Sequence, residues 1–284
     1  MPKTIYWLDN LSQLRIVYEI LSLVFLAAAF FFRQRKLLLL SLLSLLVNSF
    51  AMLPYLLPQS NPEGKSISLL TMNIWGGKNR KLSETVALIR ALDPDLVCIN
   101  EINKPWKRAL KKLLPDYPFR VDDPNSDDAA IFSKLPIQQL IPKENPWLKR
   151  FGVSATFKIG KQDILIIAVH PPAPSTYKKW MTRNLEYQQL INDVHSARMP
   201  VIIIGDLNST PWSPYFRELL EKTGLQDSAI GKGIQPSYST QYFLPLVPID
   251  HCLSSHNLVT TKRILGPALG SDHLPVYLEL QLRN

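Results

Sequence analysis

Residues 201–214 read VIIIGDLNSTPWSP, in which four large aliphatic residues lead directly into an acid and an amide. A short β-branched run followed by turn-forming residues predicts a buried β-strand that ends near Asp206. Gly205 lets the chain bend or lets another part of the molecule approach its backbone closely. Asp206 and Asn208 lie two residues apart, so their side chains point to the same side of an extended chain.

Two other interpretations compete with a functional site here. The simpler one is an Asx turn, in which Asp206 and Asn208 cap their own backbone, and for an isolated Asp-x-Asn it is the favoured one. The second is an EF-hand calcium loop, which is excluded because Pro211 and Arg217 stand where that loop requires glycine and glutamate. The remainder of the chain therefore has to decide between a turn and a site.

The first 58 residues differ in composition from the rest of the 284-residue chain and predict a membrane anchor. Residues 15–32 and 37–57 are apolar runs, each near the roughly 20 residues that a helix needs to cross a bilayer. The basic stretch 33–36 separates them, so we expect a transmembrane helical hairpin. A cleaved signal peptide is disfavoured because this chain has no basic start that leads directly into a short apolar core. A buried helix pair conflicts with the all-round apolarity of 37–57.

Basic residues around the hairpin predict its orientation. Arg33, Arg35 and Lys36 lie in the short loop, against Lys3 and Arg15 in the N-terminal flank. By the positive-inside rule the loop is cytoplasmic and both ends of the hairpin lie outside. We therefore expect an integral membrane protein whose larger domain is extracytoplasmic.

Residues 59–65 are polar and contain proline and glycine, which predicts a linker to a single domain over 66–284. The chain has a formal net charge of +9, which suits anionic partners such as nucleic acid or phospholipid head groups. Cys98 and Cys252 are too few and too far apart for a structural zinc site. A disulfide between them is compatible with the sequence but is not required by it.

Polar residues recur where the predicted strands of this domain end. They are Asn73, Glu101, Ser133, Lys134, His170, Asp206, Asn208, Asp250, His251, Ser271, Asp272 and His273. Strands interleaved with helices, such as the one expected from Ser83, predict an α/β domain of stacked sheets covered by helices. Strand ends that converge on one side of such a domain form its site.

The residue types at these strand ends indicate phosphate chemistry. Oxygen ligands such as Asn73, Glu101 and Asp272 suit Mg²⁺ or Mn²⁺ rather than zinc. Histidines with carboxylate partners suit proton transfer and stabilisation of a charged phosphoryl group. The sequence contains neither a Gly-x-Ser-x-Gly nucleophile elbow nor a glycine-rich phosphate loop.

An ordered set of motifs resembles the endonuclease/exonuclease/phosphatase superfamily, the DNase I-like proteins, over about residues 66–282. The motifs are TMNIWGG (71–77), DLVCINE (95–101), AIFSKLPI (130–137), AVH (168–170), GDLNSTP (205–211), IDH (249–251) and GSDHLPV (270–276). Each motif alone is weak, but Gly-Asp-x-Asn followed by Ser-Asp-His, with Asn and Glu upstream, is specific. The hairpin before the domain is similar to that of membrane-anchored bacterial members.

The resemblance implies a fold and an activity. The fold is an α/β four-layer sandwich, two packed β-sheets with helices outside, preceded by the transmembrane hairpin. The activity is that of a membrane-anchored, divalent-metal-dependent phosphoester hydrolase, either a nuclease or a phosphodiesterase or phosphatase. The implied partners are the lipid bilayer and an anionic substrate, nucleic acid or a phospholipid head group. The implied location is a bacterial inner (plasma) membrane.

The resemblance also implies a metal site. Asn73 and Glu101 hold Mg²⁺ or Mn²⁺, and Asp272 helps from the opposite sheet. The acid of the second motif usually follows glutamine in the family, whereas here Glu101 follows Asn100. We expect that change to be mild, because the preceding residue does not itself bind the metal.

The implied catalytic residues surround the phosphate. Asp206 positions or activates the attacking water, and Asn208 hydrogen-bonds the phosphate. His170 donates to a phosphate oxygen and stabilises charge in the transition state. His273 is the general acid/base, which Asp250 orients. Such a set supplies what phosphoryl hydrolysis needs, namely an in-line water and donors aimed at developing charge.

A non-catalytic membrane-tethered binding or scaffold module on the same fold is the alternative. We favour the enzyme because a module without activity is expected to have lost at least one of Glu101, His170, Asp206 and His273, and all four are present.

Some residues carry less specific signals. Residues 103–120 are expected to form a covering helix with a solvated basic face, although contact with nucleic acid or an anionic membrane is an alternative. Arg183 and Lys134 are further candidates to meet substrate phosphate. His251 is expected either to touch solvent at a strand end or to meet substrate.

Overall fold

The computed structural model describes residues 3–58, 66–123, 126–142, 152–241 and 247–283, so the predicted linker over 59–65 lies outside the described residues. The described helices are α1 (Lys3–Ser12), α2 (Arg15–Phe31), α3 (Arg35–Leu56), α4 (Leu82–Leu92), α5 (Lys104–Leu113), α6 (Tyr177–Ser196) and α7 (Pro214–Thr223). The described strands are β1 (Ile67–Asn73), β2 (Leu96–Asn100), β3 (Phe119–Asp122), β4 (Ala129–Ser133), β5 (Ile137–Pro142), β6 (Val153–Ile159), β7 (Gln162–Ala168), β8 (Val201–Asp206), β9 (Gln226–Asp227), β10 (Asp250–Ser254), β11 (Leu258–Leu265) and β12 (Val276–Leu282).

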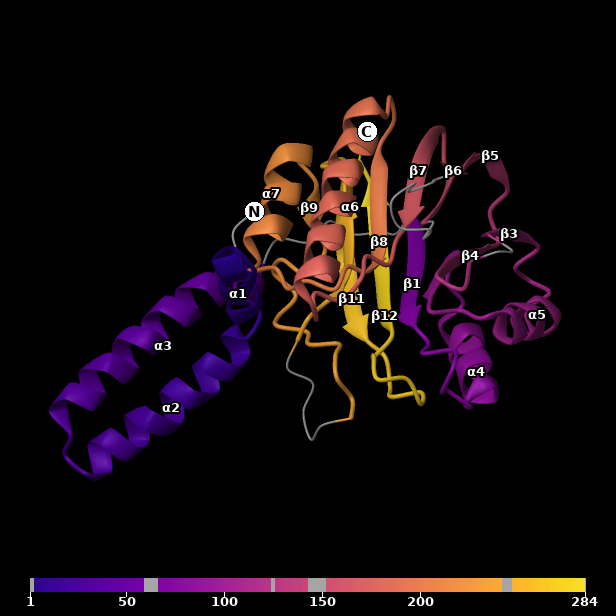
Figure 1. Cartoon of the computed structure of the whole chain (residues 1–284). Helices are drawn as coiled ribbons and strands as arrows, with labels where there is room; N and C mark the ends of the chain where they lie inside the picture. Colours follow the sequence, from indigo (N-terminus) through magenta and orange to yellow (C-terminus); the bar gives the residue numbers. More distant parts are fainter. Residues whose placement is uncertain (1–2, 59–65, 124–125, 143–151, 242–246, 284) are drawn as a thin grey trace.

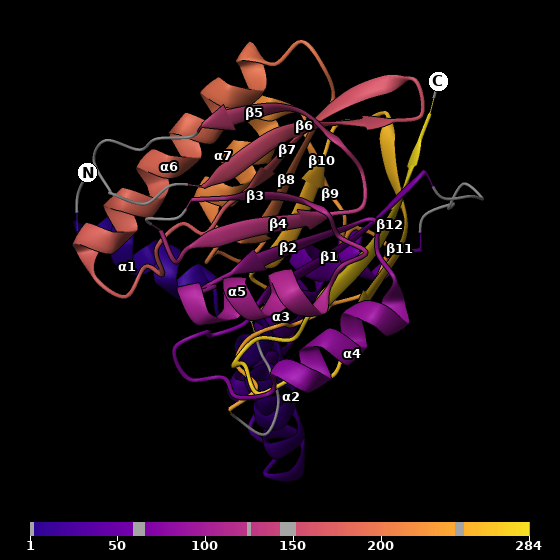
Figure 2. The same ribbon diagram turned by 90° about the vertical axis from the view of Figure 1, so that its right-hand side faces the viewer.

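Two six-stranded sheets pack face to face and form the body of the molecule. The first has the strand order β11-β12-β1-β2-β4-β3 and the second β5-β6-β7-β8-β10-β9. Helices α4 and α5 cover the outer face of the first sheet, and α6 and α7 cover the outer face of the second (Figures 1 and 2). This arrangement confirms the predicted four-layer α/β sandwich.

Strand β8 lies inside the second sheet and is buried on both of its faces. Ile202 and Ile204 join the hydrophobic cluster between the sheets, whereas Val201 and Ile203 join the cluster beneath α6 and α7. A strand that is covered on both faces needs an unbroken apolar sequence rather than an alternating one. The VIII run is therefore explained by the position of β8, with β7 parallel on one side and β10 antiparallel on the other.

Gly205 in β8 lies against the residue that follows β7 in its own sheet and against Asn100 of the first sheet. Its φ is +139°, and a Cβ atom there would lie 2.2 Å from the carbonyl oxygen of Val169 and 2.9 Å from Oδ1 of Asn100. Asn100 crosses between the sheets, since its Nδ2 donates to the Val169 carbonyl at 3.1 Å and its Oδ1 accepts from the Asp206 amide at 3.0 Å. Only glycine fits this close approach without strain.

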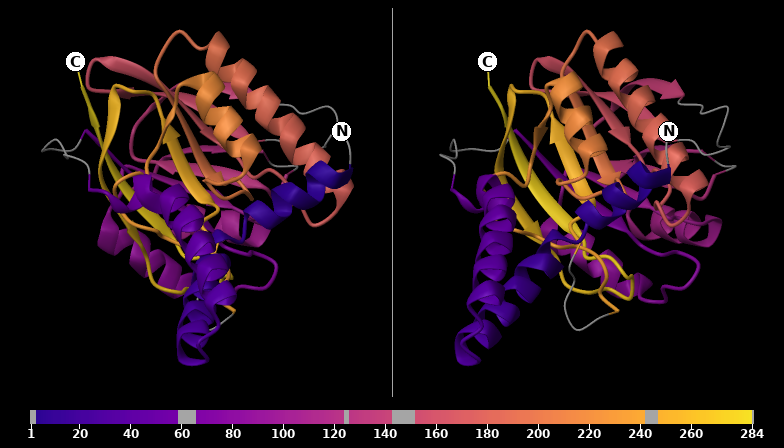
Figure 3. Two further views of the ribbon diagram at one scale, coloured as in Figure 1. Left: turned by 90° about the vertical axis from the view of Figure 1, so that its left-hand side faces the viewer. Right: turned by 60° about the vertical axis from the view of Figure 1, so that its left-hand side comes forward.

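Helices α2 and α3 lie side by side as a hairpin that projects from the sandwich (Figure 3). Side-chain hydrogen bonds link the two helices, with Ser22 donating to Ser44 at 2.7 Å and Ser49 donating to Glu19 at 2.6 Å. Helix α3 is long and apolar enough to cross a membrane by itself. Helix α2 has 17 residues and meets the same test only together with α1, from which it is bent by 67°. The transmembrane hairpin thus remains a prediction that the helix pair fits.

Helix α1 packs on the sandwich through a buried acid. Asp9 is 1% exposed and accepts hydrogen bonds from Arg183, from the indole nitrogen of Trp180 at 2.8 Å and from the Ser213 hydroxyl at 2.6 Å. Arg183 is itself fully buried and donates to the carbonyl of Asn208 at 3.2 Å. The expectation that Arg183 meets substrate phosphate is therefore wrong, because its charge is already paired inside the protein.

The end of α3 is also attached to the sandwich. The carbonyl oxygens of Pro54 and Tyr55 accept from the amides of Gly231 and Gly233 at 3.1 and 2.8 Å. The ring of Tyr55 packs edge-on against Trp212. Contacts at both ends of the N-terminal segment, rather than the linker alone, thus fix its position on the domain.

Strand β4 runs opposite to the direction that the strand-end pattern assumed. Its pairing with β2 places Ser133 opposite Leu96 and Ala129 opposite Asn100. Ser133 and Lys134 consequently lie at the far end of the sheet, where Lys134 pairs with Asp93. They do not join the other polar strand ends, and Lys134 does not meet the phosphate site.

Cys98 and Cys252 are both free thiols in the cluster between the sheets. Burial raises the pKa of Cys252 to about 12, so the thiol stays protonated at neutral pH.

Helix α5 covers the first sheet with Trp106 and Leu110 buried, and Lys111 and Lys112 exposed to solvent. The covering helix expected over 103–120 is confirmed for Lys104–Leu113, whereas Phe119 and Arg120 belong to β3.

We predict that Asp9→Ala strongly destabilises the folded chain. The substitution leaves Arg183 charged, buried and without its carboxylate, and such a loss costs about 3–5 kcal/mol. The control is Glu218→Ala, which removes an i,i+4 pair with Lys222 on the surface of α7 and costs under about 1 kcal/mol. Thermal unfolding of the full chain in detergent measures both; equal midpoints for the two variants would contradict the buried pair.

Candidate active site

All eight residues predicted for the site lie at one end of the two sheets. Asn73 and Glu101 end or follow β1 and β2, while His170, Asp206 and Asn208 follow or end β7 and β8. Asp250 begins β10, and Asp272 and His273 precede β12. Because β12 pairs with β1 in the first sheet, Asp272 comes from the same sheet as Asn73 and Glu101, and the expectation that it helps from the opposite sheet is wrong. The parallel pairs β1–β2 and β7–β8 bring their C-terminal ends together, and the antiparallel strands β10 and β12 contribute their beginnings.

Asp206 is the centre of this group. It is 1% exposed, and its Oδ1 accepts from the amide of Asn208 at 2.9 Å. Its Oδ2 lies 3.1 Å from Nδ2 of Asn73, 3.4 Å from Nε2 of His170 and 3.5 Å from Nε2 of His273. The Asx turn and the functional site are thus not exclusive, because one oxygen caps the turn and the other faces the cluster.

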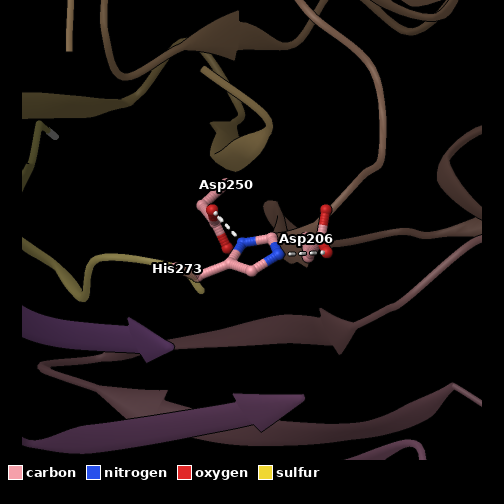
Figure 4. A group of neighbouring side chains, drawn as sticks. All are labelled: Asp206, Asp250 and His273. Atoms are coloured by element: carbon pink, nitrogen blue, oxygen red, sulfur yellow. Dashed lines mark hydrogen bonds and ion pairs between the residues drawn. The ribbon is translucent and has the colours of Figure 1, made fainter. Parts of the chain in front are cut away.

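Each of the two site histidines, His170 and His273, is hydrogen-bonded to a carboxylate through its Nδ1 atom. His273 Nδ1 lies 2.8 Å from Asp250 Oδ2, so the ring sits between Asp250 and Asp206 (Figure 4). His170 Nδ1 lies 2.7 Å from Asp128 Oδ1. In both cases the second nitrogen, Nε2, is directed toward Asp206.

Asp128 is the residue that sequence reasoning missed. It immediately precedes β4, and its carbonyl oxygen accepts from the amide of Glu101 at 2.8 Å. An antiparallel neighbour contributes its beginning, not its end, to the edge where β2 ends, and the sequence alone does not display that pairing. Ser133 and Lys134 were considered instead of Asp128.

The surrounding charges set the protonation of the two histidines. Burial lowers the pKa of His273, but Asp250 and Asp206 together outweigh it and raise the pKa to about 9. For His170 burial again lowers the pKa, and its hydrogen bonds to Asp128 and Asp206 raise it well above the ordinary value. Both rings are therefore protonated at neutral pH in the metal-free protein.

The pKa of Asp206 is shifted in the opposite direction. Burial raises its pKa, but the charge of His273 and the hydrogen bond and charge of His170 more than reverse this and lower it to about 2. The carboxylate consequently stays ionised although it is almost inaccessible to solvent. A buried acid that is kept charged by two histidines is typical of a functional site rather than of a core.

Glu101, Asp272 and Asn73 are the residues expected to hold a cation. The Oδ1 of Asn73 accepts from the Trp75 amide at 3.0 Å, and its Nδ2 faces Glu101 and Asp206. The Glu101 side chain is 38% exposed, and its Oε1 lies 3.0 Å from Nδ2 of Asn73. Burial raises the pKa of Asp272, and the negative charges of Glu101 and Asp206 raise it further, more than nearby His273 lowers it. Carboxylates that repel one another at an open edge have the hard oxygen donors that Mg²⁺ or Mn²⁺ requires.

A second group of potential ligands is Asp206, Asp250 and His273, whose donor atoms lie within 4.8 Å of one another. All three are buried, and the Nδ1 atom of His273 is already engaged by Asp250. The charged ring offsets part of the negative charge of the two carboxylates beside it.

Hydrogen bonds to backbone carbonyls hold two further polar side chains of this region, His251 and Asn208. His251 is 1% exposed, and its Nε2 lies 2.9 Å from the carbonyl of Ser209. Both expectations for His251, solvent contact and substrate contact, are therefore wrong. Asn208 has φ +50° and its Nδ2 donates to the Pro171 carbonyl at 2.9 Å, and Glu101 has φ +52°. Two non-glycine residues in the left-handed region at one site is an arrangement common at functional sites.

Comparisons with known proteins identify the family and the fold. The sequence profile described as the Endonuclease/Exonuclease/phosphatase family matches residues 70–273. A structure described as endonuclease/exonuclease/phosphatase from Beutenbergia cavernae DSM 12333 is 20% identical over 77% of this chain and 72% of that chain, with a TM-score of 0.61. A family protein from Leptotrichia buccalis C-1013-b is 15% identical over 76% of this chain and 100% of that chain, with a TM-score of 0.65.

A third similar structure is D. rerio TDP2 complexed with a single-strand DNA product, 15% identical over 76% of this chain and 98% of that chain, with a TM-score of 0.62. No curated protein sequence matches the chain. At these identities the structural likeness establishes the shared fold.

We predict that Asp250→Asn lowers the pKa of His273 in the metal-free protein. The folded pKa of about 9 exceeds the ordinary value of 6.5, so the charged ring stabilises the fold below about pH 6.5, and that stability is lost as the pH rises through about 9. Removing the Asp250 charge shifts this loss to lower pH. NMR titration of the histidine ring protons measures the change.

The matched control is Asp128→Asn, which removes the corresponding partner of His170. It should lower the pKa of His170 and leave the titration of His273 close to that of the wild type. Identical His273 titrations in wild-type and Asp250→Asn proteins would contradict the assignment.

Proposed function

Because the chain belongs to the endonuclease/exonuclease/phosphatase family, whose members hydrolyse phosphoesters, we propose that it is a membrane-anchored, divalent-metal-dependent phosphoester hydrolase. The observation that carries the proposal is the ionised, buried Asp206 between two histidines, each of which has its own carboxylate. The anchor is the hairpin of α2 and α3, for which α3 alone has the required length and apolarity.

The metal is assigned to Glu101, Asn73 and Asp272. When bound, a divalent cation neutralises the oxygens of the phosphoryl group and polarises the bond that breaks. The Glu101 side chain is 38% exposed, so it is suited to meet an ion that arrives from solvent.

His170 is suited to hold the substrate phosphate. It is protonated, its Nδ1 is fixed by Asp128, and its Nε2 faces the centre of the site. A donor held in this way is oriented before the substrate arrives, so it can stabilise the charge that develops on a phosphate oxygen. The backbone amide of Asn208 donates to Asp206, and its side-chain Nδ2, the expected phosphate donor, donates to the Pro171 carbonyl at 2.9 Å.

Asp206 and His273 accept and donate the protons that move during hydrolysis. The oxygen of the attacking water forms a bond to phosphorus while Asp206 accepts one of its protons. The bond from phosphorus to the leaving oxygen breaks, and that oxygen takes the Nε2 proton of His273. The proton on Asp206 can then return to the neutral ring across the 3.5 Å between Oδ2 and Nε2, while Asp250 holds the ring in place.

We predict that Asp206→Asn lowers the hydrolysis rate of bis(p-nitrophenyl) phosphate by about a hundredfold or more, as is typical for a group that acts in the transition state. The assay uses the full chain in detergent with Mg²⁺. The control is Asp163→Asn, an exposed acid at the start of β7, at the opposite end of the sheet. Equal rates for Asp206→Asn and wild type would contradict the mechanism. Absence of turnover in the wild type would favour the alternative of a non-catalytic binding module on the same fold.

We predict that Glu101→Gln weakens the binding of Mn²⁺ by roughly tenfold or more, because it removes a negative ligand. Titration of the full chain with Mn²⁺, followed by the EPR signal of the free ion, measures the affinity without reference to activity. The exposed Glu84→Gln on α4 serves as the matched control. An unchanged affinity in Glu101→Gln would exclude Glu101 as a ligand.

A further inference from the structure

Helix α1 has one face that no described part of the chain covers. Tyr6 and Asp9 pack against the domain, whereas Trp7, Leu8 and Leu11 on the other side are 62%, 65% and 51% exposed. Large apolar side chains in such a row on a surface helix indicate a contact with another molecule or with a membrane. Trp is also the residue type most enriched at membrane–water interfaces.

The position of α1 identifies the membrane as that contact. It leads directly into α2, and the two helices meet at an angle of 67°. If α2 and α3 cross the bilayer, a helix joined at this angle lies along the surface, not across it. The outward faces of the hairpin are apolar as well, with Phe30 and Phe50 among the most exposed hydrophobic residues, so the apolar surface of α1 continues that of the hairpin.

The domain is not free to rotate relative to this surface. Asp9 fixes α1 to Arg183 and Ser213, and the last turn of α3 is hydrogen-bonded to Gly231 and Gly233. Gln13, which follows α1, adds a further contact: its Oε1 accepts from the amide of Thr210 at 2.6 Å. Two separate attachments hold a rigid orientation, whereas a single flexible linker would not.

That orientation turns the candidate active site toward the bilayer. The site lies at the end of the sheets to which β1 points, with the loop over 266–275 beside it, and the hairpin projects toward the same side in all views (Figures 1, 2 and 3). The segment that follows Asn73 exposes Lys78, Arg80 and Lys81, and the start of α6 near α1 exposes Lys178 and Lys179. Basic side chains at this end suit an anionic lipid surface.

We propose that α1 and the hairpin mount the domain with its active site on the bilayer surface, where the substrate is the phosphoester of a membrane lipid head group. The inference rests on the proposed hydrolase activity for its substrate and on the α1 surface for its geometry. A nucleic-acid substrate fits this arrangement less well, because the bilayer would restrict the approach of a long polymer to the site.

The position of the site is tested without activity. Single cysteines replace Ala268, in the loop beside the site, and Lys161, in the turn before β7 at the opposite end; both positions are exposed, and the two native cysteines are buried. Each variant is labelled with bimane and placed in nanodiscs whose lipids carry a nitroxide on the head group. We expect quenching at 268 to exceed that at 161 severalfold, and equal quenching would overturn the orientation.

The substrate class is tested with the full chain in nanodiscs of phosphatidylcholine and phosphatidylglycerol. Head-group release is followed by phosphorus NMR, in parallel with hydrolysis of bis(p-nitrophenyl) phosphate and of a single-stranded oligonucleotide. We expect lipid hydrolysis that Asp206→Asn abolishes. Combined replacement of Trp7, Leu8 and Leu11 by Ser should lower it at least tenfold while the rate on the soluble diester stays within about twofold.

Turnover of the soluble diester or the oligonucleotide without turnover of lipid would overturn the inference and leave the hydrolase standing. Equal lipid hydrolysis by the triple-serine variant and the wild type would overturn the role of α1. Absence of turnover on all three substrates would instead remove the proposed function, and the quenching measurement would then decide the geometry by itself.

Discussion

The junction between the two sheets at Asn100 is the constraint on which the site depends. Its side chain bridges the Val169 carbonyl and the Asp206 amide, and the absence of a Cβ atom at Gly205 makes room for it. The three residues that form this junction, Asn100, Val169 and Gly205, immediately precede Glu101, His170 and Asp206. Fixing the junction therefore fixes the metal side, the phosphate donor and the central carboxylate relative to one another.

The charges of the site divide into two layers around Asp206. Asp128 and Asp250 lie behind the histidines and keep them protonated, while Glu101 and Asp272 lie beside the opening and repel each other. The first pair is balanced by the rings that it touches. The second pair is not balanced by any described side chain to the same degree, and this difference supports the proposal of a divalent cation beside Glu101 and a proton donor at His273.

Much of the fold and most of the site could be predicted from the sequence, for identifiable reasons. The run before Gly205 is apolar throughout because β8 is covered on both faces, and such a run is read directly. Asp128 escaped prediction because strand direction follows from pairing, which the sequence does not display. The burial of Arg183 could not be predicted because its partner, Asp9, is 174 residues away in the sequence. In the sequence, an arginine that is buried by such a distant contact cannot be told from a surface arginine. The attachment of α1 was missed for the same reason.

The most direct test of the central claim is a crystal structure of the chain grown with Mn²⁺, measured near the manganese absorption edge. The arrangement described above predicts an anomalous difference peak beside Glu101 and Asn73, with His273 still hydrogen-bonded to Asp250. A peak between Asp206 and Asp250 with the His273 ring as a ligand, or no peak at this end of the sheets, would contradict the division between a metal side and a proton-handling side.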